Sequence, residues 1–216
     1  DVLLTGGTGF FGPFLLKGIL EQTDQRVYVL IRATNEEQGM ERLIAAYNSV
    51  EDMTPEFECM FRSRVIPVCG DLGQRHLGLT REKWEFLAHT VQEIYHNGAT
   101  VNYLFNYDKM RNVNVLATNE ILKLAFDGQP KVFNHISTTF IFGWAVRDVL
   151  YESTSNDDIN LLDFGYSQTK WVSEEIVKDA MRRGLKGRIF RPALITPSIN
   201  GGGHNFDISI RLLAFM

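Results

Sequence analysis

The sequence predicts an α/β fold, a doubly wound parallel sheet of the Rossmann type. A short apolar run at residues 2–4 leads directly into a glycine-rich turn, and apolar residues at helical spacing follow that turn. Further apolar runs of strand length recur along the chain and alternate with helical patterns. The 216 residues suffice for one α/β domain with its own core, so we expect a single domain over residues 1–216.

The glycine turn explains how such a domain would hold a dinucleotide. Gly6, Gly9 and Gly12 recur at a spacing of three, as G-x-x-G-x-x-G. Residues without a Cβ let a pyrophosphate approach the backbone, and the following helix directs free N–H groups toward the phosphates. The alternative is a glycine-rich turn without a ligand. The position directly after a strand favours the dinucleotide site.

The remaining elements follow in order. Apolar runs predict further strands at residues 26–31, 65–69, 91–95, 131–136 and 187–190. Periodic apolar residues predict helices at residues 14–20, 36–47, 80–87 and 107–126, and another that carries Tyr166 and Lys170. In the 107–126 helix the inner positions are Met110, Val113, Leu116, Ile121, Leu124 and Ala125. Pro55 is a candidate start for a short helix. Residues 152–163 are expected to form a surface loop and residues 200–203 a glycine loop.

A cation after the second strand bears on cofactor choice. Proteins that bind NAD usually place an acidic residue here for the ribose 2′-hydroxyl, whereas this chain has Arg32. Arg32, with Arg42 on the next helix, would pair with a 2′-phosphate, so we expect NADP(H) as the cofactor. A solvated surface arginine is the alternative, and it is a stronger one for Arg42 than for Arg32.

Composition narrows the class of protein. The net charge of −4 argues against nucleic-acid binding, and no apolar run is long enough to span a membrane. Cys59 and Cys69 carry no motif and suit buried packing in a reducing compartment, so we expect a cytoplasmic protein. No signal peptide is apparent. The abrupt start at the first strand and the apolar helical pattern at residues 212–216 suggest a piece of a longer polypeptide.

Polar and small residues stand at the carboxyl ends of several predicted strands, the edge at which parallel sheets bind ligands. Asp71 is a candidate adenine contact or a turn residue, and the run from Asn97 to Ala99 lets the backbone pass near a cofactor. Ser137 and Thr138 end the fifth strand. His96 and His135 show no ligand spacing, so we expect satisfied structural histidines and no metal.

Tyr166 and Lys170 form the second constellation. Their i, i+4 spacing places both on one helix face, where an ammonium favours the phenolate and lowers the tyrosine pKa. This makes the tyrosine usable as an acid or base near neutral pH. Alone, Y-x-x-x-K is a weak signal, and a surface Tyr and Lys on an amphipathic helix is the competing interpretation. The strand-end hydroxyl of Thr138 on the same sheet favours the catalytic one.

The chain resembles the extended short-chain dehydrogenase/reductases in the turn TGGTGFFG and in Y-x-x-x-K. The runs HNGATVNY, NVLAT, HIST and GYSQTKW narrow the resemblance to the thioester reductases. That group includes terminal reductase domains of nonribosomal peptide and polyketide synthetases, and the reductase domains of carboxylic acid and aminoadipate reductases. The resemblance covers nearly the whole chain. Relatives continue beyond residue 216 into a substrate-binding region, which leaves the acyl-chain and carrier-protein surfaces undetermined.

The resemblance assigns site residues by position. It implies a catalytic set of Thr138, Tyr166 and Lys170, with Asn114 completing a proton relay. Thr138 is preferred to Ser137 because it stands five residues before Gly143. The cofactor contacts that it implies are Gly6, Thr8, Gly9, Phe10, Phe11, Gly12, Arg32, Arg42, Asp71, Leu72, Asn97, Gly98, Ala99, Tyr166, Lys170 and Pro192.

The implied activity is NADPH-dependent release of an acyl or peptidyl thioester from a phosphopantetheine carrier protein, as an aldehyde or an alcohol. The implied partner is that carrier within a larger synthetase. Alternatives are a fatty acyl-CoA reductase, a nucleotide-sugar epimerase or dehydratase of the same fold, a non-catalytic NADP-binding protein, or a fragment that binds nothing. The basic cluster Arg182, Arg183, Lys186 and Arg188 would meet an acidic carrier, although cations at a helix end are the simpler interpretation.

Overall fold

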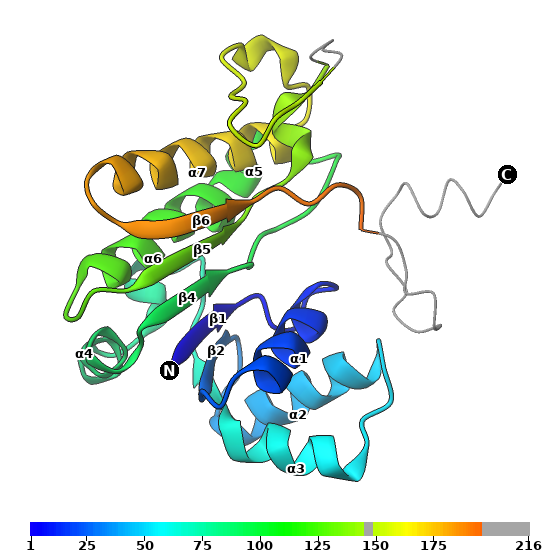
Figure 1. Ribbon diagram of the computed structural model, residues 1–216, viewed down its shortest axis with the longest axis vertical. Coiled ribbons are helices and arrows are strands. Elements are labelled where there is room, and N and C mark those ends of the chain that lie inside the picture. Colours follow the sequence, from blue (N-terminus) through cyan, green and yellow to red (C-terminus); the bar gives the residue numbers. More distant parts are fainter. Residues whose placement is uncertain (145–148, 196–216) are drawn as a thin grey trace, which may run out of the picture. The chain divides into compact units, whose positions relative to one another are not determined.

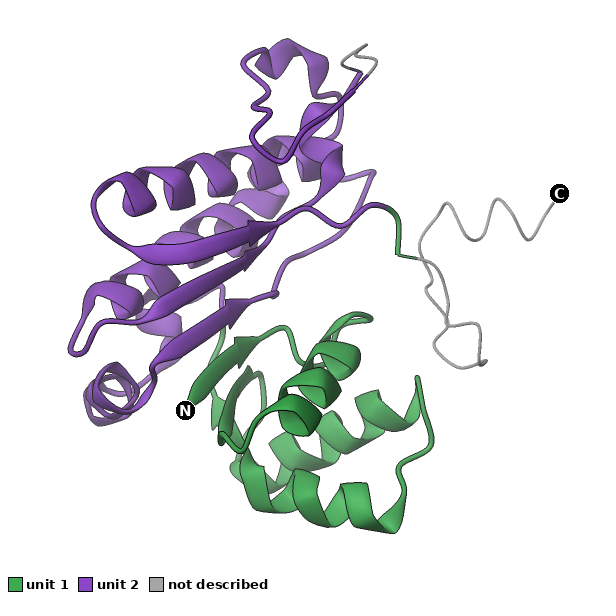
Figure 2. Cartoon of the chain, in the orientation of Figure 1, with its two compact units in different colours: residues 1–71, 194–216 green, residues 72–193 purple. Residues whose placement is uncertain are grey.

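The computed structural model describes residues 1–144 and 149–195, and it confirms the α/β prediction. Six strands form one sheet in the order β3-β2-β1-β4-β5-β6 (Figure 1). Their bounds are β1 Val2–Thr5, β2 Val27–Ile31, β3 Val65–Cys69, β4 Glu93–His96, β5 Val132–Ile136 and β6 Lys186–Phe190. By chain contacts the molecule divides into two compact units, Asp1–Asp71 with the chain from Leu194, and Leu72–Ala193 (Figure 2).

The first unit contains strands β3, β2 and β1 in parallel register, with every residue of β1 and β2 buried. Its helices are α1 Gly12–Gln22, α2 Glu36–Asn48 and α3 Pro55–Arg64. Local chemistry sets their starts: the side chains of Asn35 and Thr54 accept hydrogen bonds from the N–H groups of Gln38 and Phe57. Pro55 then opens α3, as the sequence predicted.

Strand β3 contains a proline at the outer end of the strand order. Pro67 is paired in register with Val29 of β2. The Gly70 N–H donates to the Ile31 carbonyl at 3.0 Å. Because N–H groups along a strand alternate in direction, the even-numbered residues of β3 face β2 and the nitrogen of Pro67 faces away from it. The proline therefore interrupts no bond of the β2–β3 ladder.

The second unit contains strands β4, β5 and β6 in parallel register. Its helices are α4 Arg81–Thr90, α5 Tyr107–Arg111, α6 Ala117–Phe126 and α7 Gly165–Arg182. The Thr80 side chain caps α4 by accepting a hydrogen bond from the Lys83 N–H. Short helical turns complete the unit: η1 Arg75–Gly78, η2 Asn112–Leu116, η3 Thr139–Phe142 and η4 Ile159–Leu161.

The predicted helix at residues 107–126 is continuous but not regular, because a π-helical turn, η2, separates α5 from α6. The extra residue in a π turn rotates the helix face that follows. Leu116, expected inside, is therefore exposed at 37%, whereas Met110, Ile121 and Leu124 are buried as predicted.

Other expectations also need correction. Cys59 is exposed and Cys69 half-buried, so the expected buried packing of the cysteines is wrong. Strand β4 begins at Glu93, two residues later than predicted. The expected glycine loop at residues 200–203 and the apolar pattern at residues 212–216 lie outside the described residues. Within the described ranges, no helix combines the length and apolarity needed to cross a membrane.

Candidate active site

The glycine turn between β1 and α1 is held by its own backbone. The Gly9 N–H donates to the Gly6 carbonyl, and the Gly12 N–H donates to the Gly9 carbonyl, both at 3.1 Å. A Cβ on Gly12 would lie 2.3 Å from the Gly6 oxygen and 2.6 Å from the Gly7 carbonyl carbon. No residue larger than glycine fits there. Helix α1 begins at Gly12 without a side-chain cap hydrogen bond, so the positive end of its dipole is left for an anion at the turn.

The residues expected around a 2′-phosphate lie together in the first unit. Arg32 follows β2, and the guanidinium of Arg42, on α2, donates a hydrogen bond to the Arg32 carbonyl. Both arginines are exposed. Asp71 follows the end of β3, one residue after Gly70, which continues the β2–β3 ladder. This edge therefore offers two cations and a carboxylate within one unit.

Lys170 is fixed at the centre of the second unit. Its side chain, on α7, is 4% exposed, and its ammonium donates to the Ile136 carbonyl at 2.6 Å. Thr138 comes two residues after that carbonyl. Burial lowers the Lys170 pKa to about 8, against an opposing effect of the Glu174 carboxylate. The lysine is thus poised to change its charge near neutral pH.

The two hydroxyls at the end of β5 have different surroundings. The Ser137 hydroxyl donates to a Glu174 carboxylate oxygen at 2.6 Å, on the side of α7. The Thr138 oxygen accepts a hydrogen bond of 3.2 Å from the Phe140 N–H. Because its oxygen only accepts in that contact, the Thr138 O–H remains a possible donor to a bound oxygen. The Ser137 hydroxyl is thus committed to Glu174, whereas the Thr138 hydroxyl can still donate to a ligand.

Tyr166 lies one turn before Lys170 on α7 and is 9% exposed. Its ring has two aromatic neighbours at roughly right angles, Tyr103 with centroids 6.0 Å apart and Phe140 at 6.3 Å. Phe164 also packs edge-on against Tyr103. Sequence reasoning did not single out these aromatic residues. Tyr103 is the last residue of the run HNGATVNY, which begins at the end of strand β4. That position at the carboxyl end of a strand was the only feature of the sequence that could have indicated it.

Asn114 lies in the π-helical turn and links three parts of the second unit. Its amide nitrogen donates to the Thr100 carbonyl and to the Thr169 hydroxyl, both at 3.0 Å, and its oxygen accepts from the Thr100 N–H at 2.7 Å. The side chain thereby ties the segment after β4 to α7, on the turn that carries Lys170. π turns often occur at functional sites, and this one carries a predicted site residue.

The remaining predicted contacts stand at strand ends. Asn97, Gly98 and Ala99 directly follow β4, and Gly98 is buried. The Pro192 carbonyl, just after β6, accepts a hydrogen bond of 3.1 Å from the Thr139 N–H, which extends the β5–β6 pairing past both strands. Leu72 is the first residue of the second unit. All of these residues lie at the edge of a parallel sheet where ligands bind.

The two buried histidines differ from each other. His96 lies 3.0 Å from the Thr118 hydroxyl, and burial, with a further effect of the Lys170 charge, lowers its pKa to about 3. His135 is fully buried, and neither of its ring nitrogens has a hydrogen-bond partner among the described residues. The expectation of a satisfied histidine is therefore wrong for His135. In the described ranges, no group of three or more His, Cys, Asp or Glu side chains is placed to hold a metal.

Three of the four cations in the basic cluster near the end of α7 pair with carboxylates. Arg182 and Arg183 both contact Asp179, and Arg188 contacts Glu93 across the strands. Arg182 and Arg183 therefore belong to the end of α7, as the simpler interpretation held.

Comparison with known proteins identifies the family. Residues 4–216 match the NAD-binding family described as male sterility protein. The chain belongs to this family. A linear gramicidin synthase of Brevibacillus parabrevis is 38% identical over 216 residues, which are 98% of this chain and 4% of that protein. The large subunit of the L-2-aminoadipate reductase of Candida glabrata is 35% identical to this chain over 231 aligned residues. The alignment covers 99% of this chain and 16% of that subunit.

A solved structure agrees with this placement. The terminal reductase domain from the myxalamid polyketide–peptide pathway superposes with a TM-score of 0.93 at 38% identity, over 98% of this chain and 54% of that one. The male sterility family thus places the chain among terminal reductase domains of synthetases and aminoadipate reductases, within the extended short-chain dehydrogenases. The chain spans about half the length of that solved domain and a small part of the curated relatives.

Proposed function

We propose that the chain belongs to a thioester reductase that uses NADPH to release an acyl or peptidyl group from a phosphopantetheine carrier as an aldehyde. The observation that carries this proposal is the position of Lys170: buried on α7, one turn after Tyr166, and bonded to the end of the strand that carries Thr138. A lysine ammonium one helix turn from a phenol can stabilise the phenolate, which supports the proposal.

The first unit fits the cofactor. The position of Gly12 admits no Cβ, and the positive end of the α1 dipole suits a pyrophosphate. Arg32 and Arg42 would pair with a 2′-phosphate, and Asp71 with Leu72 would contact the adenine. In the second unit, Asn97, Gly98, Ala99 and Pro192 would border the nicotinamide. The cations after β2 are the reason for proposing NADP(H) rather than NAD(H).

The chemistry is addition of hydride to the thioester carbonyl carbon, and NADPH supplies the hydride when it is bound. The hydroxyls of Thr138 and Tyr166 stabilise the charge that develops on the carbonyl oxygen. Tyr166 donates its proton to that oxygen, and Lys170 stabilises the phenolate left behind. The hemithioacetal then expels the thiol and yields the aldehyde. Asn114, through Thr100 and Thr169, keeps the turn that carries Lys170 in register.

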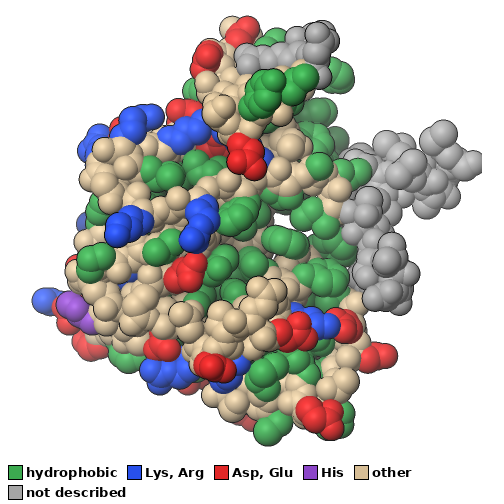
Figure 3. All heavy atoms as spheres, in the orientation of Figure 1, with side chains coloured by type: hydrophobic (Ala, Val, Ile, Leu, Met, Phe, Trp, Pro, Cys, Tyr) green, Lys and Arg blue, Asp and Glu red, His purple; other side chains and the backbone are tan. Residues whose placement is uncertain are grey.

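Apolar side chains support an acyl substrate. Val101, Leu104 and Phe105, in the segment after β4 that also carries Tyr103, are exposed, and Trp144 is exposed after η3. In Figure 3, apolar side chains lie open on one face of the molecule among acidic and basic ones. Such side chains offer contact surface to a hydrocarbon or peptidyl chain on its carrier arm.

The test is reduction of an acyl-pantetheine thioester by the full-length polypeptide that contains this chain. We expect NADPH consumption with aldehyde formation, and a loss on the order of 10²–10³ in rate for Tyr166→Phe, because one oxyanion donor is removed. Tyr95→Phe, a change on β4 outside the catalytic set, is the matched control. A near-parental rate for Tyr166→Phe would contradict the proposal. Turnover of a nucleotide sugar without net NADPH consumption would instead favour an epimerase.

A further inference from the structure

Glu174 is the acceptor for several donors in the second unit. It lies one turn after Lys170 on α7 and its side chain is 1% exposed. One carboxylate oxygen accepts from the Ser137 hydroxyl at 2.6 Å and from Arg191 Nε at 3.2 Å. The other lies 2.7 Å from a terminal nitrogen of Arg191 and 2.9 Å from the Lys178 ammonium. Hydrogen bonds from Arg191, Ser137 and Lys178 outweigh burial and lower the Glu174 pKa, so the carboxylate stays ionised.

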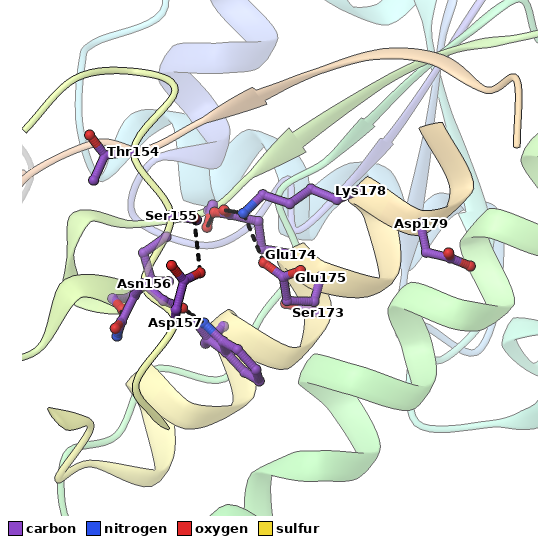
Figure 4. Close-up of polar contacts among 12 residues, drawn as sticks. Thr154, Ser155, Asn156, Asp157, Ser173, Glu174, Glu175, Lys178 and Asp179 are labelled. Carbon is purple, nitrogen blue, oxygen red and sulfur yellow. Dashed lines mark hydrogen bonds and ion pairs between the residues drawn. The ribbon is translucent and has the colours of Figure 1, made fainter. Parts of the chain in front are cut away.

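Arg191 extends this contact to a loop. Its guanidinium donates to the carbonyls of Glu152 and Thr154, both at 3.0 Å, and lies over the Phe142 ring at 5.3 Å. Figure 4 shows Glu174 and Lys178 pointing toward one another on α7, with the segment that carries Thr154 beside the helix. Arg191 directly follows β6, which ends at Phe190, and it precedes Pro192.

Lys170 and Glu174, on successive turns of α7, thus hydrogen-bond to Ile136 and Ser137, two successive residues at the end of β5. Lys170 bonds the Ile136 carbonyl, and Glu174 bonds the Ser137 hydroxyl. The next residue is Thr138, whose backbone neighbours are bonded to the end of β6: the Ser137 N–H donates to the Phe190 carbonyl and the Thr139 N–H to the Pro192 carbonyl. The position of the Thr138 hydroxyl relative to α7 therefore depends on the Ser137–Glu174 contact as well as on the sheet.

We propose that Glu174 is a positioning residue for the reductase, which sets the Thr138 hydroxyl against the Tyr166 phenol by binding Ser137 and, through Arg191, fixes the loop at residues 152–154. This inference rests on the proposed function of Thr138, Tyr166 and Lys170. It adds a residue that touches neither substrate nor cofactor and acts through Ser137 and Arg191. Small displacements of a catalytic group cost large factors in rate, which gives such a contact its effect.

Three variants in the full-length polypeptide test the role. Glu174→Gln keeps the size of the side chain and removes its charge, and Ser137→Ala removes the hydroxyl that joins strand to helix. Glu175→Gln is the matched control, because the Glu175 carboxylate pairs only with Lys178 among the described ion pairs. We expect kcat for an acyl-pantetheine thioester to fall about tenfold or more in the first two, with NADPH affinity retained and the control at the parental rate.

The pH profile separates positioning from loosened structure. Lys170 faces Tyr166 and Glu174 on α7, His96 on β4 and His135 on β5, and both histidines have lowered pKa values and stay neutral. The negative charge of Glu174 raises the Lys170 pKa. Glu174→Gln should therefore move the alkaline limb of kcat to lower pH, whereas Ser137→Ala and Glu175→Gln should leave it in place. A general loss of packing would not produce this difference.

The outcomes are distinct. Parental kcat in both Ser137→Ala and Glu174→Gln, alongside an inactive Tyr166→Phe, would overturn the positioning role alone. The positioning role would also be overturned if kcat falls only in proportion to a loss of NADPH affinity and the alkaline limb of the kcat profile does not shift. If Glu174→Gln does not fold, Ser137→Ala decides through its kcat. If the Tyr166→Phe variant still reduces the thioester at the parental rate, both this inference and the proposed function are overturned.

Discussion

The ammonium of Lys170 donates a hydrogen bond of 2.6 Å to the Ile136 carbonyl oxygen, so a buried cation on α7 is tied to the carboxyl end of β5. The bond holds the lysine ammonium at a carbonyl that stands two residues before Thr138, and Tyr166 lies one turn earlier on the same helix. A neutral carbonyl acceptor offsets the cost of burying the lysine charge less than a direct carboxylate partner would, so burial remains the larger effect on its pKa.

The rate of thioester reduction should fall as pH rises through about 8. Burial lowers the Lys170 pKa to about 8, and in the proposed mechanism the protonated lysine is the form that stabilises the phenolate. The contribution is therefore present below that pH and lost above it. Lys170→Arg, in which the side chain keeps its proton at higher pH, should reduce the maximal rate but shift the alkaline fall of the rate to higher pH. The measurement is single-turnover NADPH oxidation against pH, with Lys123→Arg on the exposed face of α6 as the control.

Arg32→Ala should weaken NADPH binding about tenfold or more, because it would remove the charge-assisted bond to the 2′-phosphate that we propose for this arginine. NADH, which lacks that phosphate, should bind the variant and the parent equally. Fluorescence titration with both cofactors measures the two affinities. Arg62→Ala, an exposed α3 residue paired with Glu58, should change neither. Equal losses for NADPH and NADH would contradict the assignment of Arg32.

Two glycines of α1 should respond oppositely to alanine. At Gly12 the new Cβ would meet backbone atoms at 2.3–2.7 Å, so Gly12→Ala should displace the turn and weaken NADPH binding. At Gly18 a Cβ would meet nothing within 4 Å, so Gly18→Ala should stabilise the protein by about 0.5–1 kcal/mol. Chemical denaturation and cofactor titration of the pair check both statements. Unchanged cofactor affinity in Gly12→Ala would show that the turn tolerates a side chain.

The buried histidines should make the protein less stable in mild acid. Burial lowers the pKa of His96 to about 3 and that of His135 well below its ordinary value, so both stay neutral in the folded state. Unfolded histidine protonates near 6.5, and stability present above that pH is lost as pH falls below it, by about 1.4 kcal/mol per pH unit for each proton. Urea denaturation across the range from neutral to mildly acidic pH measures this slope.

His135→Met isolates one of these two protons. In this variant, the loss of stability per pH unit should be smaller by the contribution of one proton. It should also gain stability at neutral pH, because a buried polar group without a partner is replaced by an apolar one. His89→Gln, at an exposed position of α4, should leave the slope unchanged. A slope in His135→Met equal to that of the parent would mean that His135 does not stay neutral in the fold.

Much of the fold could be predicted because local chemistry determines it. The caps at Thr54 and Thr80, the proline at the start of α3 and the glycine turn before α1 are each written in a few adjacent residues. The apolar runs identified all six strands for the same reason. The proximity of Arg42 to Arg32 was expected from the helix that follows β2, and a bond to the Arg32 carbonyl realises it.

What the sequence could not provide depends on tertiary packing. The π turn at Asn114 reverses the expected burial of Leu116, and no periodicity in the sequence announces it. The missing partners of His135 and the exposure of Cys59 depend on which neighbours the fold supplies. Glu174 stands at i+4 from Lys170, so its place on the same helix face was readable, but its contact with Ser137 spans 37 residues of chain.

Pro67 bears on how the sheet avoids other chains. Its nitrogen faces away from β2, so the open side of β3 lacks a donor in the middle of the strand. An incoming segment would find its ladder broken there, which discourages the edge-to-edge pairing that seeds aggregation. A residue that is neutral for the internal ladder thus acts against polymerisation, and Pro67→Val should raise the tendency of the protein to form aggregates at high concentration.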